Sequence, residues 1–528
     1  MVLAGALLLV TGAREVRAGE GHEAEDAFWR DAAGLLPGFE GRPEPAGPSE
    51  EDGQWGEVIP WPFIPVSAAT LPDGKLLTFC GQERRHWPGT ATRTHTAIWD
   101  PSAETFDEDL YLDHEMFCAH LVMRTDGLLQ TVGGRYVIEH SSVFDFRTNR
   151  WSRVADMHDP RWYPTAVALP DGDVFTVSGS GGENTAERYV AATDNWNLLT
   201  GIDWSGVANA VGFESHWWPY LFVAPDGRLF HFGPTETMHW VDPTGAGTRV
   251  SANIVVPANH YPKHAGVVMY DAGKILVAGG SGWVHSKLST TTSYTVDLTT
   301  EPPTVELCAP MHHARRFACP VVLPGGQVLM IGGNTSGKKF SDEGSILTAE
   351  LWDPETDTWH ELADMAVPRN YHSIALLLPD GRVISGGGGY GSAGTESWHH
   401  QDVQMFTPPQ LFAPGGSAAD RPSITAAPTS VSTGSVFPVA ATPGMHQVAA
   451  VRMMATTHGW SSDQRRIDLP FAERSPGQYQ LVAHPNTNVM VPGYWMLFAI
   501  AEDGAYSEAT IFHVKEAGEG SEACLLYT

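Results

Sequence analysis

The sequence lacks the features that define several large classes of protein. No apolar run reaches the roughly 20 residues that a helix needs to cross a bilayer, which argues against an integral membrane protein. Basic residues are scarce, because 32 lysines and arginines stand against 61 acidic residues and leave a formal net charge of −29. That balance argues against binding to nucleic acid or anionic lipid, since both are bound through lysine and arginine. Five cysteines in 528 residues are too few for a disulfide scaffold, and their odd number leaves at least one thiol to be explained.

Glycine and proline, by contrast, are abundant. The chain has 55 glycines and 38 prolines, and only 18% of its residues are charged. This composition indicates many tight turns and an all-β chain rather than a helical one. Apolar residues make up 42% of the sequence, which is enough for a large core and excludes wholesale disorder.

The first residues are typical of an export signal. Residues 2–10 (VLAGALLLV) are apolar, and the small-residue pattern of a cleavage site ends at Ala18. We expect residues 1–18 to be a signal peptide and the protein to be secreted, although the usual basic n-region is missing. A buried N-terminal strand or an upstream start site is the alternative. Residues 19–54 hold ten acidic and two basic side chains, a composition that suits a solvated leader.

From about Trp55 the chain repeats one pattern seven times, with steps of about 50 residues. Each copy has an apolar stretch, a D-G-like turn, a second apolar stretch and then glycines, as in LPDGKLLTFCG and LPDGRVISGGG. Such a unit indicates two short strands joined by a tight turn whose glycine supplies positive φ. The seven turn glycines are Gly74, Gly127, Gly172, Gly227, Gly273, Gly326 and Gly381.

A second element follows the glycines in four of the copies: two aromatic residues seven positions apart, such as Tyr189 and Trp196. A period near 50 residues with glycine pairs and a spaced aromatic pair is typical of the kelch form of the β-propeller. Stacked β-sandwiches would not explain the fixed order of these elements. We therefore expect a seven-bladed kelch propeller over residues 55–415.

The repeat stops after Gly389, and a turn-rich boundary follows. Residues 416–516 alternate apolar and polar residues in short runs such as SVFPVAAT and GYWMLFAIAEDG. Within this range, residues 424–516 are about ninety residues of short strands with turns between them, which predicts an immunoglobulin-like (early-set) β-sandwich over 416–516. Residues 517–528 form a tail.

No standard catalytic motif is present, but two tyrosines stand beside proline-arginine pairs, in PRWYPT (160–165) and PRNYHS (368–373). Each segment lies just before the first strand of a blade, at an entrance that faces the channel. Taken singly, Tyr163 fits a core aromatic and the Tyr371-His372 pair fits an ordinary loop. EMFCAH (115–120) occupies a comparable place one blade earlier.

Together with THGW, which contains His458, these motifs resemble the copper-radical oxidases, the galactose oxidase and glyoxal oxidase family. The resemblance implies that Cys118 forms a thioether with the ring of Tyr163, which would be an equatorial copper ligand and the seat of a protein radical. It also implies that Tyr371 is the axial ligand and general base, and that His372 and His458 are equatorial ligands. All five residue types are present without substitution.

The chemistry of this donor set agrees with the resemblance. Two imidazoles and two tyrosine oxygens suit Cu(II), and bound Cu(II) displaces the proton of a phenol whose pKa is ordinarily about 10. Copper alone changes by one electron, whereas oxidation of an alcohol or aldehyde needs two. One copper ion and a protein-derived Cys-Tyr radical cofactor would supply both, and the odd cysteine would be used by a bond to carbon. Cys308 and Cys319 are candidates for a disulfide in an exported protein. Their predicted separation by a blade's width favours free thiols instead, because disulfides need Cα atoms within about 7 Å.

The expected reaction converts small aldehydes or primary alcohols with O2 to the oxidised product and H2O2. A peroxide-consuming enzyme downstream is the partner that such a product calls for. One alternative is a non-catalytic kelch propeller that binds glycan or protein, and another is a galactose oxidase-type alcohol oxidase.

The sequence departs from galactose oxidase in one respect that concerns substrate. That enzyme has a tryptophan that stacks on the thioether, whereas the matching stretch 178–187 has none. The residues around Tyr163 resemble those of the glyoxal oxidase branch more closely. We therefore expect a more open site unless another loop covers it, with Trp217, Trp218 and Trp460 as candidate walls of the pocket. Such a site should oxidise small aldehydes or simple primary alcohols better than galactose.

Overall fold

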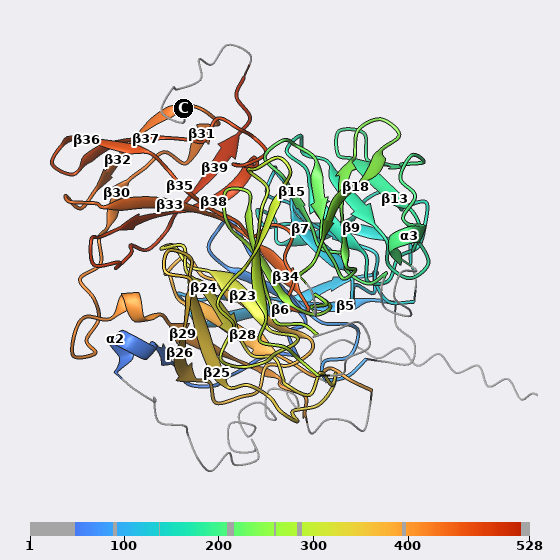
Figure 1. Cartoon of the computed structure of the whole chain (residues 1–528), viewed down its shortest axis with the longest axis horizontal. Helices are drawn as coiled ribbons and strands as arrows, with labels where there is room; N and C mark the ends of the chain where they lie inside the picture. The colour runs from blue at the N-terminus through green and yellow to red at the C-terminus, as the bar shows by residue number, and fades with distance from the viewer. Residues whose placement is uncertain are drawn as a thin grey trace, which may run out of the picture. The chain divides into compact units, whose positions relative to one another are not determined.

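The computed structural model consists almost entirely of antiparallel strands (Figure 1). Seven sheets of four or five strands are followed by two further sheets, which confirms the prediction of an all-β chain with a seven-bladed propeller and an early-set sandwich. The residues that the structure describes are 48–87, 92–136, 138–208, 216–257, 260–281, 288–392 and 398–518. The predicted signal peptide lies outside them, as do most of the leader and tail, and the predicted domain limits stay predictions. No helix in the described part is long and apolar enough to cross a membrane.

The second to sixth blades each consist of four consecutive strands. They are β7 (His120–Met123), β8 (Leu129–Val132), β9 (Ser141–Asp145) and β10 (Arg150–Arg153); β11 (Thr165–Ala168), β12 (Val174–Val177), β13 (Ala186–Val190) and β14 (Asn195–Leu198); β15 (Leu221–Val223), β16 (Leu229–His231), β17 (Thr237–Asp242) and β18 (Thr248–Val255); β19 (Gly266–Asp271), β20 (Lys274–Ala278), β21 (Ser293–Asp297) and β22 (Thr304–Leu307); and β23 (Cys319–Val322), β24 (Val328–Ile331), β25 (Thr348–Asp353) and β26 (Thr358–Asp364). A short helix, α3 (Ser205–Ala208), lies between the third and fourth blades. The first two strands of most blades are buried at every position, as their continuous apolar runs require.

The seventh blade combines the two ends of the propeller sequence. Its strands are β27 (Ser373–Leu377), β28 (Val383–Gly387) and β29 (Asp402–Thr407), and β29 pairs with both β1 (Gln54–Trp55) and β2 (Ile59–Pro60). The first blade contains β3 (Ser67–Thr70), β4 (Leu76–Phe79), β5 (Thr94–Asp100) and β6 (Thr105–Leu112). The short α2 (Ser49–Asp52) and the 3-10 turn η2 (Pro409–Leu411) flank this closure. The start of the propeller is therefore tied to its last blade by backbone hydrogen bonds.

The repeated sequence signals have direct structural counterparts. All seven turn glycines have positive φ, between 71° and 97°. At Gly381 a side chain is excluded for a second reason, because a Cβ atom there would lie 2.5 Å from the ring of Tyr506 in the sandwich. The aromatic pairs are cross-strand neighbours, as Tyr189 faces Trp196 between β13 and β14.

The C-terminal sandwich consists of two sheets, one with β30 (Ile424–Ala426), β32 (Val436–Ala441), β37 (Gln478–Val482) and β36 (Phe471–Ser475), the other with β31 (Ser430–Ser432), β39 (Thr510–Lys515), β38 (Gly493–Ile500), β33 (Gln447–Arg452) and β35 (Arg466–Asp468). One strand of this part of the chain joins the propeller instead. β34 (Ala455–Thr457) leaves the sandwich and pairs with β3, with Ser67 opposite Thr457 (Figure 1). The residue that follows it is His458, so this excursion carries a C-terminal side chain to the inner strands of the blades.

Candidate metal centre

The predicted site residues sit where the chain turns into an inner strand. Cys118 precedes β7, Tyr163 precedes β11 and His372 precedes β27, with φ values of 63°, 64° and 75°. A non-glycine residue in this left-handed region costs on the order of 1–3 kcal/mol and persists only where the surrounding structure holds it. His458, at the end of β34, has the same conformation, with φ 56°. Four predicted site residues thus share a strained backbone.

The proline-arginine pairs of PRWYPT and PRNYHS now have a structural explanation. Arg161, two positions before Tyr163, is fully buried and donates to the Glu187 carboxylate at 2.9 Å and to three backbone carbonyls. Arg369, two positions before Tyr371, pairs in the same way with a carboxylate of β29, at 2.6 Å. A buried charge is tolerated when a carboxylate pairs with it and further hydrogen bonds hold it, as at both arginines, although the Nε of each has no partner among the described residues. Each arginine therefore fixes the segment that carries a site tyrosine.

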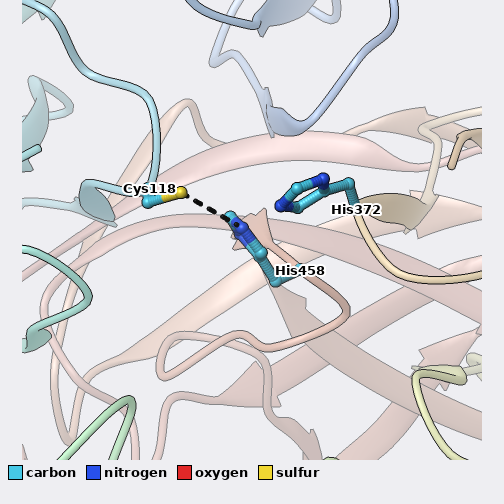
Figure 2. Close-up of side chains that lie close together, drawn as sticks. All are labelled: Cys118, His372 and His458. Carbon is cyan, nitrogen blue, oxygen red and sulfur yellow. Dashed lines mark hydrogen bonds between the residues drawn. The ribbon is translucent and has the colours of Figure 1, made fainter. Parts of the chain in front are cut away.

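The structure brings all five predicted site residues together. The Tyr371 hydroxyl donates to the Tyr163 hydroxyl at 3.2 Å, and the Cys118 Sγ lies 3.6 Å from His458 Nε2. The rings of His372 and His458 have centroids 4.4 Å apart, and the His458 ring lies 5.4 Å and 5.6 Å from those of Tyr371 and Tyr163. Cys118, His372 and His458 each offer a ligand atom within 4.8 Å of the other two, and Figure 2 shows them converging from three separate segments.

Both imidazoles are oriented by a partner on their Nδ1 side. His372 Nδ1 lies 2.5 Å from the carbonyl oxygen of Gly389, which only accepts, so Nδ1 carries the proton and Nε2 keeps its lone pair. That Nε2 is buried and has no hydrogen-bond partner in the described part of the chain. His458 Nδ1 lies 2.6 Å from the Thr457 hydroxyl, which leaves its Nε2 toward the cluster. Such outer contacts are the usual way in which metal-binding histidines are fixed.

Burial keeps the groups of the site neutral. It lowers the pKa of His372 to about 3 and that of His458 well below its usual value, so neither imidazole is protonated near neutral pH. Burial also raises the pKa of the Tyr163 phenol, with the nearby Cys118 and Tyr371 adding to the effect. Burial raises the pKa of the Cys118 thiol as well. A bound cation would supply the charge that a Tyr163 phenolate needs.

These residues fit a copper ion. Two neutral imidazoles, one with an unpartnered buried nitrogen, and two phenol oxygens form the mixed N and O donor set that suits Cu(II). Cys118 lies beside these donors, and Cys118, His372 and His458 form the alternative set of metal ligands.

Comparison with known proteins agrees with this geometry. Residues 65–410 match the family model described as glyoxal oxidase N-terminus, and residues 421–514 match the galactose oxidase-like early set domain. A solved structure described as a novel fungal alcohol oxidase of the AA5 family, in complex with copper, is similar with a TM-score of 0.83. It is 30% identical and covers 88% of this chain and 100% of its own. The chain belongs to the copper-radical oxidase family.

Relatives of this chain include proteins named as galactose oxidases and proteins named as aldehyde oxidases. The galactose oxidase of Gibberella zeae is 33% identical over 489 residues, which cover 88% of this chain and 71% of that one. The aldehyde oxidase GLOX of Vitis pseudoreticulata is 26% identical, over 66% of this chain and 72% of that one. The predicted proximity to the glyoxal oxidase branch is therefore not reflected in these identities, although the family model carries that name.

The ring of Tyr163 is covered by two tryptophans that lie outside residues 178–187. The Trp162 ring stacks on Tyr163 with centroids 4.6 Å apart and planes 26° apart, and Trp217 lies 4.4 Å from the same ring. Tyr163 is only 5% exposed. The absence of a tryptophan from residues 178–187 is thus offset by two tryptophans from other segments. Trp162 could have been suspected from the sequence, because it directly precedes Tyr163.

A cavity of about 320 Å³ opens over the two tyrosines, which are among its walls. Arg135 and Lys339 contribute the two cationic side chains of this cavity, which we call the aromatic pocket. Its other walls are the rings of Trp87, Phe117, Trp162, Trp217 and Phe340. Apart from Trp217, the sequence did not single out these wall residues. Trp162 lies beside a predicted site residue, whereas Trp87 and Phe340 come from distant parts of the chain with no local signal.

The other two tryptophans proposed as pocket walls lie elsewhere. Trp218 and Trp460 line a second, much smaller cavity of about 20 Å³ beside His458. The Trp460 ring packs against Tyr220 at 4.9 Å, and the Trp218 ring lies 4.0 Å from that of His458. They support the metal centre from within the core rather than face the aromatic pocket.

The remaining described cysteines are free thiols, as predicted for Cys308 and Cys319. Cys308 is half-buried after β22 and Cys319 is buried in β23 of the next blade.

Proposed function

We propose that this copper-radical oxidase converts small aldehydes or simple primary alcohols, with O2, to the oxidised product and H2O2. The observation that carries the proposal is the placement of the Tyr371 and Tyr163 hydroxyls, 3.2 Å apart, at the base of the aromatic pocket and beside Cys118 and two buried imidazoles. A non-catalytic glycan- or protein-binding propeller would need none of these groups beneath its pocket.

Tyr163, Tyr371, His372 and His458 are proposed as the copper ligands, and Cys118 as the thioether partner of Tyr163. Support for the thioether comes from contact, because the Tyr163 N–H donates to the Cys118 carbonyl at 3.3 Å and the thiol lies close enough to the phenol to raise its pKa. When bound, copper supplies one of the two redox equivalents that the oxidation needs.

The chain's own residues then handle the protons and the substrate. In the phenolate form, which a bound cation would stabilise, Tyr371 is placed to accept the proton of a substrate hydroxyl in the pocket, as a general base. A phenoxyl radical at Tyr163 would accept the hydrogen atom from the carbon that is oxidised. Trp162 and Trp217 hold the Tyr163 ring in place and shield it from water.

The walls of the pocket favour small, weakly hydroxylated substrates over galactose. Besides the two tyrosines, its described walls are aromatic rings and two cations, with no carboxylate or amide. The hydroxyls of a hexose would leave water and find few partners, and each unsatisfied polar group costs about 1–3 kcal/mol.

Copper content, together with an absorption spectrum before and after mild oxidation, tests the metal and the radical. A peroxide-coupled assay across glyoxal, methylglyoxal, glycolaldehyde, benzyl alcohol and galactose then tests the substrate. We expect about one copper per chain and galactose among the poorest substrates. Galactose ahead by more than about tenfold, roughly 1.4 kcal/mol, would refute the substrate assignment. A protein that binds no copper would refute the oxidase and favour the glycan- or protein-binding alternative.

We also propose that the protein is exported, on the basis of the apolar residues 2–10 and the small residues that end at Ala18. N-terminal sequencing of protein recovered from the medium tests this, with Gly19 expected as the first residue.

A further inference from the structure

The aromatic pocket contains an arginine that none of the reasoning above requires. Arg135 follows the two glycines that end β8, and its guanidinium carbon lies 4.8 Å from the ring centre of Tyr136, 5.5 Å from that of Trp87 and 5.9 Å from that of Phe117. These cation–π contacts surround the guanidinium with aromatic rings. Ring faces attract its charge but leave its N–H groups to other hydrogen-bond acceptors.

One of those N–H groups has no partner. Arg135 Nη1 is buried and makes no hydrogen bond with the described residues, and no ion pair of Arg135 occurs among them. Glu115 is the nearby carboxyl, but its oxygens accept the backbone N–H groups of Gln82 and Phe117. A buried charged donor is costly to leave without an acceptor, and because Arg135 lines the aromatic pocket, a ligand bound there would supply one.

The charged side chains among the described walls of the pocket have one sign. Lys339, the second cation of the pocket, has its Nζ 5.1 Å from the ring centres of both Trp217 and Tyr371. No aspartate or glutamate is among the described walls. The protein as a whole is strongly acidic, with a formal net charge of −29, so this patch is a local exception to its surface. A local concentration of positive charge in an apolar cleft attracts an anion.

We infer that Arg135 binds a carboxylate on the substrate, so that the pocket selects small aldehydes or primary alcohols that carry a carboxylate over neutral analogues of the same shape. The guanidinium fork matches the two oxygens of a carboxylate, and the aromatic walls accommodate the carbon skeleton between that end and the tyrosine hydroxyls. The oxidation of the substrate rests on the proposed function, whereas the binding of a carboxylate by Arg135 rests on the pocket alone.

Matched substrate pairs test it in the peroxide-coupled assay with copper-loaded protein. The pairs are 4-(hydroxymethyl)benzoate with 4-methylbenzyl alcohol, and glyoxylate with methylglyoxal. We expect kcat/KM to favour the carboxylate member about tenfold or more, with the difference mainly in KM. In R135Q this ratio should fall to within about threefold, and R135K should retain part of it. A wild-type ratio within threefold, or a ratio unchanged in R135Q, would overturn the inference.

Arg147 provides the control. Its guanidinium also lies over an aromatic ring, that of Phe146 at 4.5 Å, but it pairs with Asp145 and is outside the pocket. R147Q should leave activity and the substrate ratio unchanged. A change as large as that in R135Q would mean that general charge, rather than the pocket, sets the preference.

A binding measurement separates this inference from the proposed function. Three tryptophans line the pocket, so benzoate binding can be followed by quenching of their fluorescence, with benzyl alcohol as the neutral probe. Benzoate should bind wild-type protein at least tenfold more tightly than R135Q. That result with no oxidation of any substrate would refute the oxidase but keep the anion site. Equal benzoate affinity in the two proteins would overturn the anion site, whatever the activity.

Discussion

Replacement of Cys118 by serine separates a radical oxidase from an ordinary metal site. The change exchanges one sulfur for one oxygen at a fully buried position and leaves the four proposed ligands in place. A buried hydroxyl without a partner costs about 1–3 kcal/mol, but the Tyr163 phenol is close enough to serve as one. We therefore expect C118S to fold, with a loss of stability near the lower end of that range, and to bind copper.

Activity should respond far more strongly than stability. Without the thioether, the Tyr163 radical would form at the higher potential of a plain phenol, and each 59 mV is worth tenfold for one electron. A rise of roughly 180 mV lowers the radical population about a thousandfold, equivalent to about 4 kcal/mol in the activation barrier. We expect kcat in C118S to fall by about this factor.

Mass spectrometry detects the thioether bond between Cys118 and Tyr163 directly. After exposure to Cu(II) and oxygen, the wild-type protein should lose two hydrogens, about 2 Da, and trypsin should release one linked product of residues 94–124 and 162–188. C80S is the matched control, because Cys80 is also fully buried and its Sγ contacts the carbonyls of Gly81 and Glu83. That variant should keep the linked peptide and the activity. Activity within tenfold of wild type in C118S, or a wild-type protein without the linked product, would refute the radical reasoning.

Three further changes test other parts of the structure. Tyr371→Phe keeps the buried ring but removes the hydroxyl that contacts Tyr163. We expect kcat to fall at least about a hundredfold while copper is still bound, which stopped assays and metal analysis measure. A loss of activity below fivefold would contradict the role of Tyr371 as the general base. Glu187→Gln leaves the charge of Arg161 buried and unpaired. This change should lower the free energy of unfolding, measured by urea titration, by about 3–5 kcal/mol. A loss under about 1 kcal/mol would mean that the ion pair does not anchor the segment that carries Tyr163. Burial lowers the pKa of His114 to about 3, from about 6.5 in the unfolded chain. The unfolded chain therefore binds a proton first, and the free energy of unfolding should fall by about 1.4 kcal/mol per pH unit as the pH drops below 6.5. H114Q should lose this part of the pH dependence, and an unchanged slope in urea titrations would refute it.

The sequence by itself determined the architecture of the blades. Each blade is specified within about 50 consecutive residues, because turn glycines, apolar strands and cross-strand aromatic pairs act over short separations. The turn glycines and aromatic pairs occupy the positions that their spacing predicted. The five proposed site residues were also named from sequence, since each lies in a short motif that resembles the family. Four of them stand just before an inner strand of a blade, whereas His458 follows β34.

Only the tertiary structure decided what surrounds those residues. Cys118 and His458 are 340 positions apart and meet because β34 leaves the sandwich to pair with β3. The cover of Tyr163 by Trp162 and Trp217, and the cationic side of the pocket at Arg135, arise where separate blades converge. Such contacts carry no periodic signal, because a side chain's neighbours across a propeller depend on the closure of all seven blades rather than on any local stretch of chain.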